Sequence, residues 1–290
     1  MNPPVWFWSM ADPEHDQPDS SNGAVPDNGT DPTAAWTRSE WDRMWRPSMW
    51  LRRPTHQRGM HIWHIVAIVA LTGYANIIAN AVLNPWWHIP FNLGILFVAL
   101  VIARHAGVTV PDLGYCKDRI PRGLAVGGIV MGVIGLGVVV GVAIPATREF
   151  FYDDRVIERS TTVILFDALI RIPIATAFYE ETLFRGVLFG MFVRRWAPLW
   201  AALVTNLLFG LWHILPTINT LETNPAGGML EGIPGIVIAA IGSVAGTALA
   251  GFGFLWLRLR ANSTVAPWMA HIATNSFALI AALFVVRVLG

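Results

Sequence analysis

Five stretches of the chain contain no Asp, Glu, Lys or Arg and are long enough to cross a lipid bilayer. A helix needs roughly 20 apolar residues to span about 30 Å of hydrocarbon. Charged residues make up only 13% of the chain, against about 25% in soluble domains. A soluble all-α protein is the alternative, but buried soluble helices rarely run so long without a charged face. The uncharged stretches are residues 59–103, 123–147, 196–221, 232–257 and 261–286.

These stretches predict an all-α fold, a polytopic membrane helix bundle of about 7–8 transmembrane helices. The first stretch is long enough for two crossings, and prolines at the connections mark turns between the others. We expect the bundle to occupy residues 61–290. The predicted spans are residues 61–83, 89–104, 122–145, 161–193, 198–215, 234–257 and 265–287.

The N-terminal part differs in composition from the rest of the chain. We expect residues 1–35 to form a disordered cytoplasmic tail, because residues 9–35 are rich in Asp, Pro, Ser, Asn and Gly. The apolar run Val5 to Met10 is too short for a secretory signal. Residues 36–60 interleave four tryptophans with arginines, which predicts a basic interfacial segment at anionic lipid headgroups. Binding of a protein partner is the alternative for this segment.

The arginines indicate which ends of the spans face the cytoplasm. They cluster before the first span, between the second and third, and after the fourth and sixth, whereas residues 216–233 contain none. The positive-inside rule then places the N-terminus in the cytoplasm of a multi-pass protein of the plasma membrane. The chain lacks the basic face on a soluble fold that a nucleic-acid-binding protein would need, so we expect no nucleic-acid partner.

The fourth predicted span breaks the usual rules for a membrane helix. At about 1.5 Å per residue, residues 161–193 would form a helix about 50 Å long. The span also carries five charged residues and Pro173, and each charge costs at least about 2.5–3.5 kcal/mol on insertion scales. We therefore expect an interfacial piece up to about Arg171, a bend near Pro173, and then the true span.

Two adjacent carboxylates in this span are predicted to differ in role. Glu181 and Arg185 are four residues apart, so on a helix they share a face and can pair. Glu180 points about 100° away from Glu181 and has no such partner in its own helix. Glu180 is thus free to act as a base, although a buried ion network that only fixes helix packing remains the alternative.

Polar residues on two other spans can reach the same membrane layer. His213 follows Phe209 by four residues on the fifth span, and Asn275 follows His271 by four on the seventh. At about 1.5 Å per residue, all of these groups lie about 17–27 Å from the nearest predicted cytoplasmic arginine. Intramembrane ionisable groups face the bundle interior or a wet cavity rather than lipid.

This set of residues suits attack by water on an amide bond. Such a reaction needs a base that activates water and donors aimed at the oxygen that becomes negative. We expect Glu180, aided by His213, to hold and deprotonate the water. His271 and Asn275 would form the oxyanion site. The chain contains no G-x-S-x-G motif for a serine nucleophile.

Three motifs in this order resemble the CPBP family of intramembrane proteases, also called the ABI family, which includes the type II CAAX prenyl endopeptidases. Residues 180–185 fit E-E-x-x-x-R, residues 209–213 fit F-x-x-x-H, and residues 271–275 fit H-x-x-x-N. The resemblance covers about 161–288 and implies a helical protease core with a membrane-embedded cavity. It implies catalytic roles for Glu180, His213, His271 and Asn275 and supporting roles for Glu181, Arg185 and Phe209. It also implies an endopeptidase that acts on a peptide or membrane-protein substrate, either lipidated or unmodified.

Other functions remain open from the sequence. A metal-dependent protease could bind zinc through Glu180, His213 and His271, but H-E-x-x-H is absent, so we favour a glutamate-type enzyme without a cofactor. A non-proteolytic membrane scaffold or immunity-type protein could use the same polar network as a partner site. A proton-coupled transporter is the third alternative, but the inverted halves that it would need are not evident.

Overall fold

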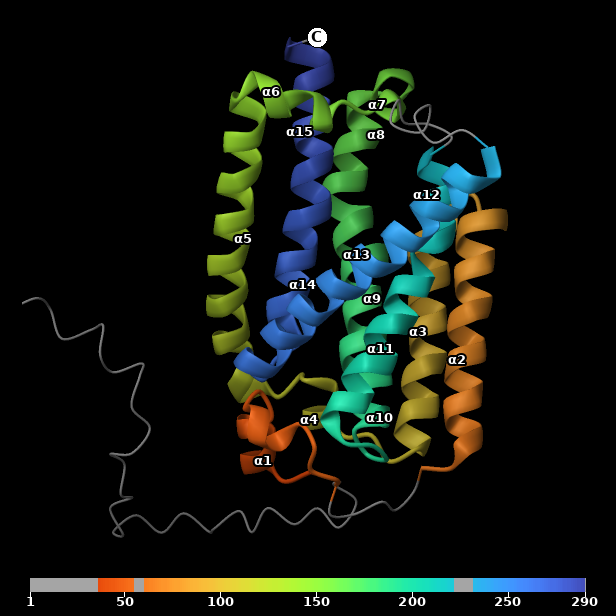
Figure 1. The fold of residues 1–290 in the computed structure, drawn as a ribbon, viewed down its shortest axis with the longest axis vertical. Helices are drawn as coiled ribbons and strands as arrows, with labels where there is room; N and C mark the ends of the chain where they lie inside the picture. Colours follow the sequence, from red (N-terminus) through yellow and green to blue (C-terminus); the bar gives the residue numbers. More distant parts are fainter. Residues whose placement is uncertain (1–35, 55–59, 222–231, 290) are drawn as a thin grey trace, which may run out of the picture. The chain divides into compact units, whose positions relative to one another are not determined.

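The computed structural model describes residues 36–54, 60–221 and 232–289, all of which fall within the unit Asp31–Gly290. Every regular element in this described part is a helix (Figure 1). Seven of the helices are long and apolar enough to cross a membrane. The predicted all-α polytopic membrane bundle is therefore confirmed. The tail predicted at residues 1–35 lies outside the described residues.

The seven membrane helices follow the predicted spans closely. Their bounds are α2 (Ile62–Ile77), continued by a π-helical turn (Ile78–Val82); α3 (His88–His105); α5 (Ile120–Ala143); the fourth helix, from α8 (Thr161–Phe166) to α10 (Phe189–Phe192); α11 (Pro198–Trp212), continued by α12 (Ile214–Leu221); α13 (Gly232–Ala261); and the last helix, from α14 (Val265–Ile272) through α15 (Ala278–Phe284) to Leu289. Short helices lie before and between the membrane helices. Helix α1 (Arg38–Arg43) precedes the first of them, and α4 (Val110–Leu113), α6 (Pro145–Arg148) and α7 (Asp154–Glu158) lie in the connections.

The fourth helix differs from the expectation of an interfacial piece followed by a bend. It runs as unbroken helix from Thr161 to Phe192, whereas a division into two pieces near Pro173 was expected. The interfacial position of its first part stays a prediction. Its backbone is π-helical over η6 (Asp167–Phe178), α-helical over α9 (Tyr179–Glu181) and π-helical again over η7 (Thr182–Leu188). The wider π-helical hydrogen-bond pattern accommodates Pro173, which lacks a backbone N–H. One continuous helix therefore carries both the charged upper part and the glutamate pair.

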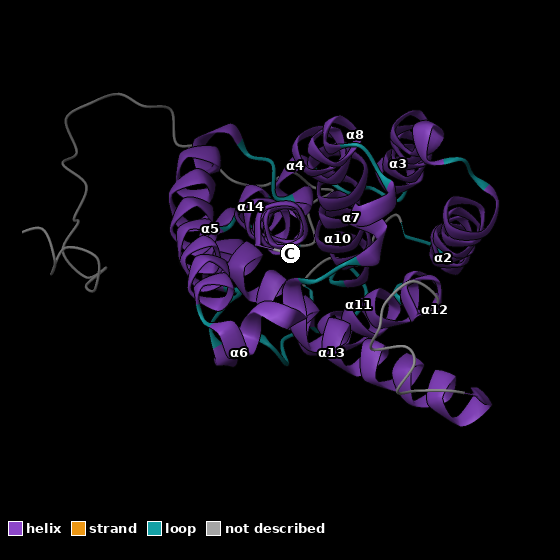
Figure 2. Cartoon of the chain, turned by 90° about the horizontal axis from the view of Figure 1, so that it is seen from above, coloured by secondary structure: helices purple, strands orange, loops and turns teal. Residues whose placement is uncertain are grey.

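This fourth helix lies among the other helices rather than at their edge. It contacts α3 on one side and α11, α13 and α14 on the others. Figure 2, seen along the bundle, shows the fourth helix between α14 and α3, which contact its η6 part. Helix α13 crosses the bundle obliquely in Figure 1 and packs along α11. Residues on α9, α11 and α14 are thus brought to the interior of the bundle.

Glycines allow α11 and α13 to approach closely beside the fourth helix. A Cβ atom added at Gly210 on α11 would lie 2.5 Å from the backbone oxygen of Val244 on α13. A Cβ added at Gly251 on α13 would lie 2.6 Å from Asn206 Oδ1 and 3.0 Å from Arg185 Nη2. Real Cβ atoms do not make contacts this short, so only glycine fits at these two positions. The close packing fixes the distance between α11 and the charged side chains of the fourth helix.

Large apolar side chains project outward from the membrane helices. Phe97 on α3 is 67% exposed, Ile129 on α5 is 70% exposed, and Leu249 on α13 is 72% exposed. Soluble monomers rarely display apolar surfaces of this kind over whole helices. A bilayer would cover these faces.

The segment before the first membrane helix packs against one end of the bundle. Trp36 and Trp41 are buried, and their indole N–H groups donate to the backbone oxygen of Val193 at 2.8 Å and to Asp112 at 3.2 Å. The start of α1 is fixed by a capping box between Thr37 and Glu40. These tryptophans therefore anchor the segment to the protein itself. Contact of its exposed arginines with lipid headgroups stays a prediction.

Candidate active site

The predicted catalytic residues lie on three of the membrane helices. Glu180 belongs to α9 within the fourth helix, His213 caps the C-terminal end of α11, and His271 lies on α14. Asn275 lies one turn further along, in the π-helical turn after α14 (Ala273–Phe277). Residues 180 and 271 are thus 91 positions apart in sequence, and helix packing alone brings them together.

Two of these residues, His213 and His271, approach the same carboxylate oxygen of Glu180. Oε2 of Glu180 lies 4.0 Å from Nε2 of His213 and 3.9 Å from Nε2 of His271. The Glu180 and His271 side chains are 8% and 4% exposed, and that of His213 is 22% exposed. Within the part of the chain that the structure describes, this oxygen has no hydrogen-bond partner. The site is therefore a buried cluster of one carboxylate oxygen and two imidazole nitrogens.

The other ring nitrogen of each histidine is already engaged. Nδ1 of His213 lies 2.8 Å from the backbone oxygen of Phe209. A carbonyl oxygen only accepts hydrogen bonds, so Nδ1 of His213 donates. Nδ1 of His271 lies 2.8 Å from Oε1 of Glu181, and this carboxylate also faces Arg185. In their neutral forms, both rings then direct an Nε2 lone pair toward Glu180.

The pair predicted from the spacing of Glu181 and Arg185 is present. Nη1 of Arg185 donates to Oε1 of Glu181 at 3.0 Å, and both side chains are at most 1% exposed. The Arg185 guanidinium also lies 4.0 Å from the ring centre of Phe209. Phe209 in turn packs edge-on against His213, with ring centres 4.5 Å apart. Glu181 therefore contacts His271 and Phe209 contacts His213, while Arg185 contacts both of these supporting residues.

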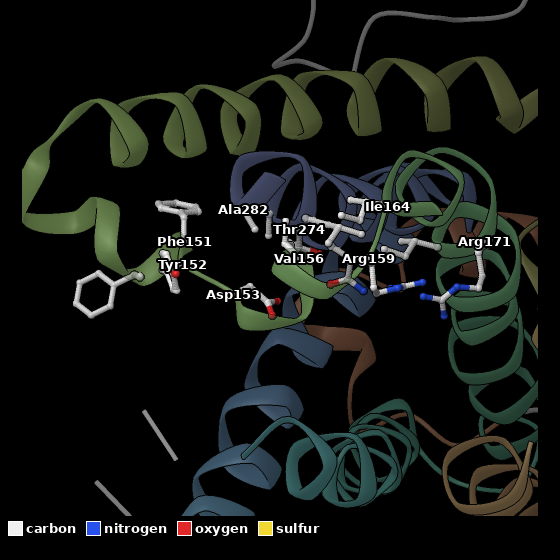
Figure 3. A pocket seen from close by; sticks show the side chains of 14 residues that line it. Phe151, Tyr152, Asp153, Val156, Arg159, Ile164, Arg171, Thr274 and Ala282 are labelled. Atoms are coloured by element: carbon white, nitrogen blue, oxygen red, sulfur yellow. The ribbon is translucent and has the colours of Figure 1, made fainter. Parts of the chain in front are cut away.

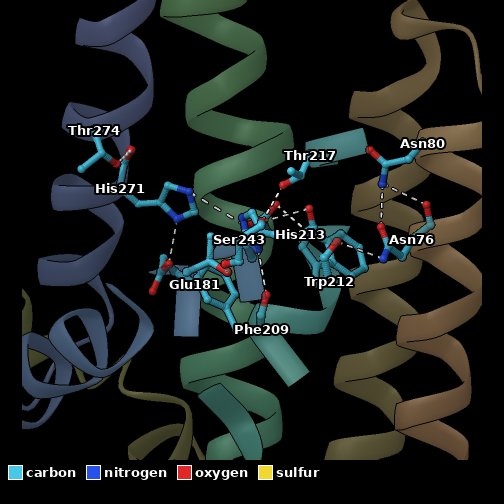
Figure 4. A network of polar contacts seen from close by, with 12 residues as sticks. Asn76, Asn80, Glu181, Phe209, Trp212, His213, Thr217, Ser243, His271 and Thr274 are labelled. Carbon is cyan, nitrogen blue, oxygen red and sulfur yellow. Dashed lines mark hydrogen bonds and ion pairs between the residues drawn. The ribbon is translucent and has the colours of Figure 1, made fainter. Parts of the chain in front are cut away.

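Trp212 is a site residue that the sequence did not reveal. Its indole N–H donates to Oε1 of Glu180 at 3.0 Å. Its backbone oxygen accepts from the side-chain amide of Asn76 on α2 (Figure 4). A tryptophan inside an apolar span carries no pattern that distinguishes a hydrogen-bond donor from a packing residue. Its position next to His213 was the only available signal.

Among the described residues, no hydrogen bond joins Asn275 to Glu180, His213 or His271. It is half-buried and lines a cavity of about 440 Å³ between the fourth and last helices. Arg159, Arg171 and Thr274 also line this cavity (Figure 3). Both arginines pair with the buried carboxylate of Asp167, each at 2.5 Å. Asn275 thus faces a polar cavity one helical turn away from His271.

The geometry also bears on the zinc alternative. Two ligands of a tetrahedral zinc ion bound at about 2.0–2.1 Å lie about 3.4 Å apart. The Glu180 oxygen is 3.9 Å and 4.0 Å from the two imidazole nitrogens, which is about half an ångström too wide. Among the described residues, no group of three or more His, Cys, Asp and Glu side chains is arranged to hold a metal ion. The Glu180 oxygen is therefore further from each imidazole nitrogen than two ligands of a tetrahedral zinc ion are from one another.

Comparison with protein families identifies the segment that carries these residues. Residues 162–277 match the family model described as type II CAAX prenyl endopeptidase Rce1-like. This part of the chain is similar to the type II CAAX prenyl endopeptidases of the Rce1-like family. The resemblance to the CPBP family predicted from the three motifs is therefore confirmed. All four candidate catalytic residues fall inside the matched segment.

The Rce1-like match implies a protease in a membrane setting that acts on a peptide or protein substrate. No curated protein matches the chain. No solved structure matches it either. The matched segment covers the fourth to the seventh membrane helices, whereas α2, α3 and α5 lie outside it.

Proposed function

We propose that this Rce1-like protein is an intramembrane endopeptidase in which a water molecule held by Glu180 and His213 hydrolyses a peptide bond. The observation that carries the proposal is the convergence of Glu180 Oε2 with the Nε2 atoms of His213 and His271. The Glu180 oxygen and the Nε2 atom of a neutral His213 are hydrogen-bond acceptors that face one another inside the bundle, so they need a donor between them. Water supplies two donors and is also the reactant.

The spacing between Glu180 and His213 suits a bound water. A water about 2.8 Å from each of two acceptors that are 4.0 Å apart makes acceptable hydrogen bonds to both. Both of its hydrogens then point at the protein, and an oxygen lone pair remains for the substrate. As that oxygen attacks the carbonyl carbon, Glu180 takes one proton. The same proton then passes to the amine that leaves when the C–N bond breaks.

His271 and Asn275 are proposed to stabilise the negative oxygen of the tetrahedral intermediate. His271 would donate from Nε2 as an imidazolium, whose charge Glu181 stabilises from the other side through the 2.8 Å contact at Nδ1. Asn275 would donate through its side-chain amide from the wall of the adjacent cavity. A substrate that extends from the cavity toward Glu180 would meet both donors.

The substrate proposed is a peptide or membrane protein, either lipidated or unmodified, and the name of the matched family points to prenylated substrates. We propose that the enzyme is of the glutamate type and needs no cofactor, because the candidate ligands are too widely spaced for zinc.

We further propose that the protein lies in the plasma membrane with its N-terminus in the cytoplasm. Residues 36–60 would lie at the lipid interface, and the protease core would occupy about 161–288.

The proposal is tested by purifying wild type and Glu180→Ala in detergent. Both are incubated with a fluorogenic library that includes prenylated and unmodified C-terminal peptides. Cleavage by wild type that disappears in a folded Glu180→Ala protein would support the assignment. Equal cleavage by both proteins would contradict it. A different pair of results would establish the scaffold alternative. Neither protein would cleave any peptide, and cells with Glu180→Ala would keep a phenotype that is lost when the gene is deleted.

A further inference from the structure

The two oxygens of the Glu180 carboxylate have different surroundings. Oε1 accepts the indole N–H of Trp212 at 3.0 Å. Oε2 is buried, has no hydrogen-bond partner among the described residues, and faces the two histidines. The terminal torsion of a glutamate has broad, shallow preferences, so the side chain alone does not select this orientation. The hydrogen bond from the Trp212 indole to Oε1 constrains it.

Trp212 is itself held in place from several sides. It is 6% exposed, and its ring packs against Phe184 and Tyr179 with ring centres 5.8 Å and 5.9 Å away. Its backbone oxygen accepts from Nδ2 of Asn76 at 3.0 Å. Asn76 in turn accepts from the side-chain amide of Asn80, which lies in the π-helical turn that continues α2. Figure 4 shows these amides on the side of Trp212 away from His271.

We propose that Trp212 is a positioning residue for Glu180: it holds Oε1 so that Oε2 faces the imidazoles and the reacting water. This inference rests on the proposed role of Glu180 as the base. Trp212 does not face the cavity that Asn275 lines, so its effect on the reaction passes through Glu180. The Asn76 contact extends this support to α2, outside the Rce1-like segment.

Trp268 provides a matched control. Its indole N–H donates at 2.9 Å to the backbone oxygen of Pro173, and its ring packs against Phe178 on the same helix as Glu180. Trp212→Phe and Trp268→Phe each remove one indole hydrogen bond and keep an aromatic ring. Only the first hydrogen bond ends on the carboxylate.

The kinetic test compares both variants with wild type and with Glu180→Gln on a cleaved peptide. A hydrogen bond to a charged group is strong enough that its loss should lower kcat about 10- to 100-fold in Trp212→Phe, with KM changed less than about twofold. Trp268→Phe should keep the wild-type kcat. Wild-type kcat in Trp212→Phe, or an equal fall in both variants, would overturn the proposal. Wild-type activity in Glu180→Gln would instead refute the proposed function, and the positioning role with it.

A second measurement needs no substrate. In infrared spectra of the purified protein, the carboxyl band that disappears in Glu180→Gln belongs to Glu180. Loss of the indole donor should move this band in Trp212→Phe, while Trp268→Phe leaves it in place. A band that stays in place in Trp212→Phe would show that the indole does not hold the carboxylate and would overturn the inference.

Discussion

Oε1 of Glu181 lies 2.8 Å from Nδ1 of His271, and the same oxygen accepts a hydrogen bond from Nη1 of Arg185 at 3.0 Å. The contact joins two helices whose residues are 90 positions apart. It also fixes the orientation of the His271 ring, in the way that a carboxylate orients the histidine of a catalytic triad. Glu181 therefore serves both the packing of the bundle and the orientation of a proposed catalytic group.

Removing the charge of Glu181 should affect stability and activity together. Glu181→Gln leaves the buried Arg185 guanidinium without its counter-charge, which costs about 3–5 kcal/mol. It also removes the charge that stabilises a His271 imidazolium, so kcat should fall about 100-fold or more. Thermal unfolding in detergent and peptide cleavage measure the two effects.

The double variant Glu181→Gln, Arg185→Gln separates these effects. It removes the guanidinium that Glu181→Gln leaves without a counter-charge, so part of the lost stability should return. Activity should stay low, because His271 still lacks a carboxylate at Nδ1. Full activity in the double variant would show that Glu181 does not act through His271.

Asn275 should matter for the rate of the reaction rather than for substrate binding. Loss of one oxyanion donor lowers kcat by about 100- to 1,000-fold in other hydrolases, and we expect Asn275→Ala to fall in this range with little change in KM. Thr274→Ala is the matched control, since Thr274 lines the same cavity and donates only to the backbone oxygen of His271. Equal losses in both variants would instead indicate damage to the local helix.

Treatment with metal chelators should leave the activity unchanged. The separation of Glu180 Oε2 from the two imidazole nitrogens is too wide for a tetrahedral zinc ion. The measurement is peptide cleavage after dialysis against a strong chelator and assay in metal-free buffer. Activity that disappears and returns when zinc alone is added back would establish the metal-dependent alternative.

Two glycines on α13 provide a test of the packing around the site. A Cβ at Gly251 would lie 3.0 Å from Arg185 Nη2, whereas a Cβ at Gly253 would have no neighbour within 4 Å. Gly251→Ala should destabilise the protein by about 1–3 kcal/mol through overpacking and lower its activity. Gly253→Ala should be neutral or slightly stabilising, because alanine favours helix. Thermal unfolding of both variants decides this, and equal midpoints would contradict the close approach of α13 to Arg185.

Patterns within one helix accounted for much of the fold and of the site. Uncharged length predicted the membrane helices because lipid excludes charge, and the predicted spans match the observed ones. The spacing of Glu181 and Arg185 predicted their pair because residues four apart share a helix face. The predicted layer shared by Glu180, His213 and His271 agrees with their convergence in the structure.

Features that depend on contacts between helices could not be predicted. Trp212 became a donor to Glu180 only through the packing of α11 against the fourth helix. Trp36 and Trp41 were expected at the lipid interface, but they are buried against the bundle because Val193 and Asp112 supply acceptors there. Where a bend was expected near Pro173, the helix continues with π-helical backbone, a pattern that the position of the proline alone does not reveal.

The central claim is that Glu180 activates a water molecule that cuts a peptide bond. A single-turnover reaction in ¹⁸O-labelled water, with enzyme in excess over peptide, tests it most directly in wild type and Glu180→Gln. We predict one ¹⁸O atom in the new C-terminal carboxylate of the wild-type product, no label in Glu180, and a loss of at least about 100-fold in rate for Glu180→Gln. Label incorporated into Glu180 would reveal a covalent intermediate. Cleavage by Glu180→Gln at the rate of the wild-type protein would show that this carboxylate takes no part in the reaction. Either result would contradict the claim.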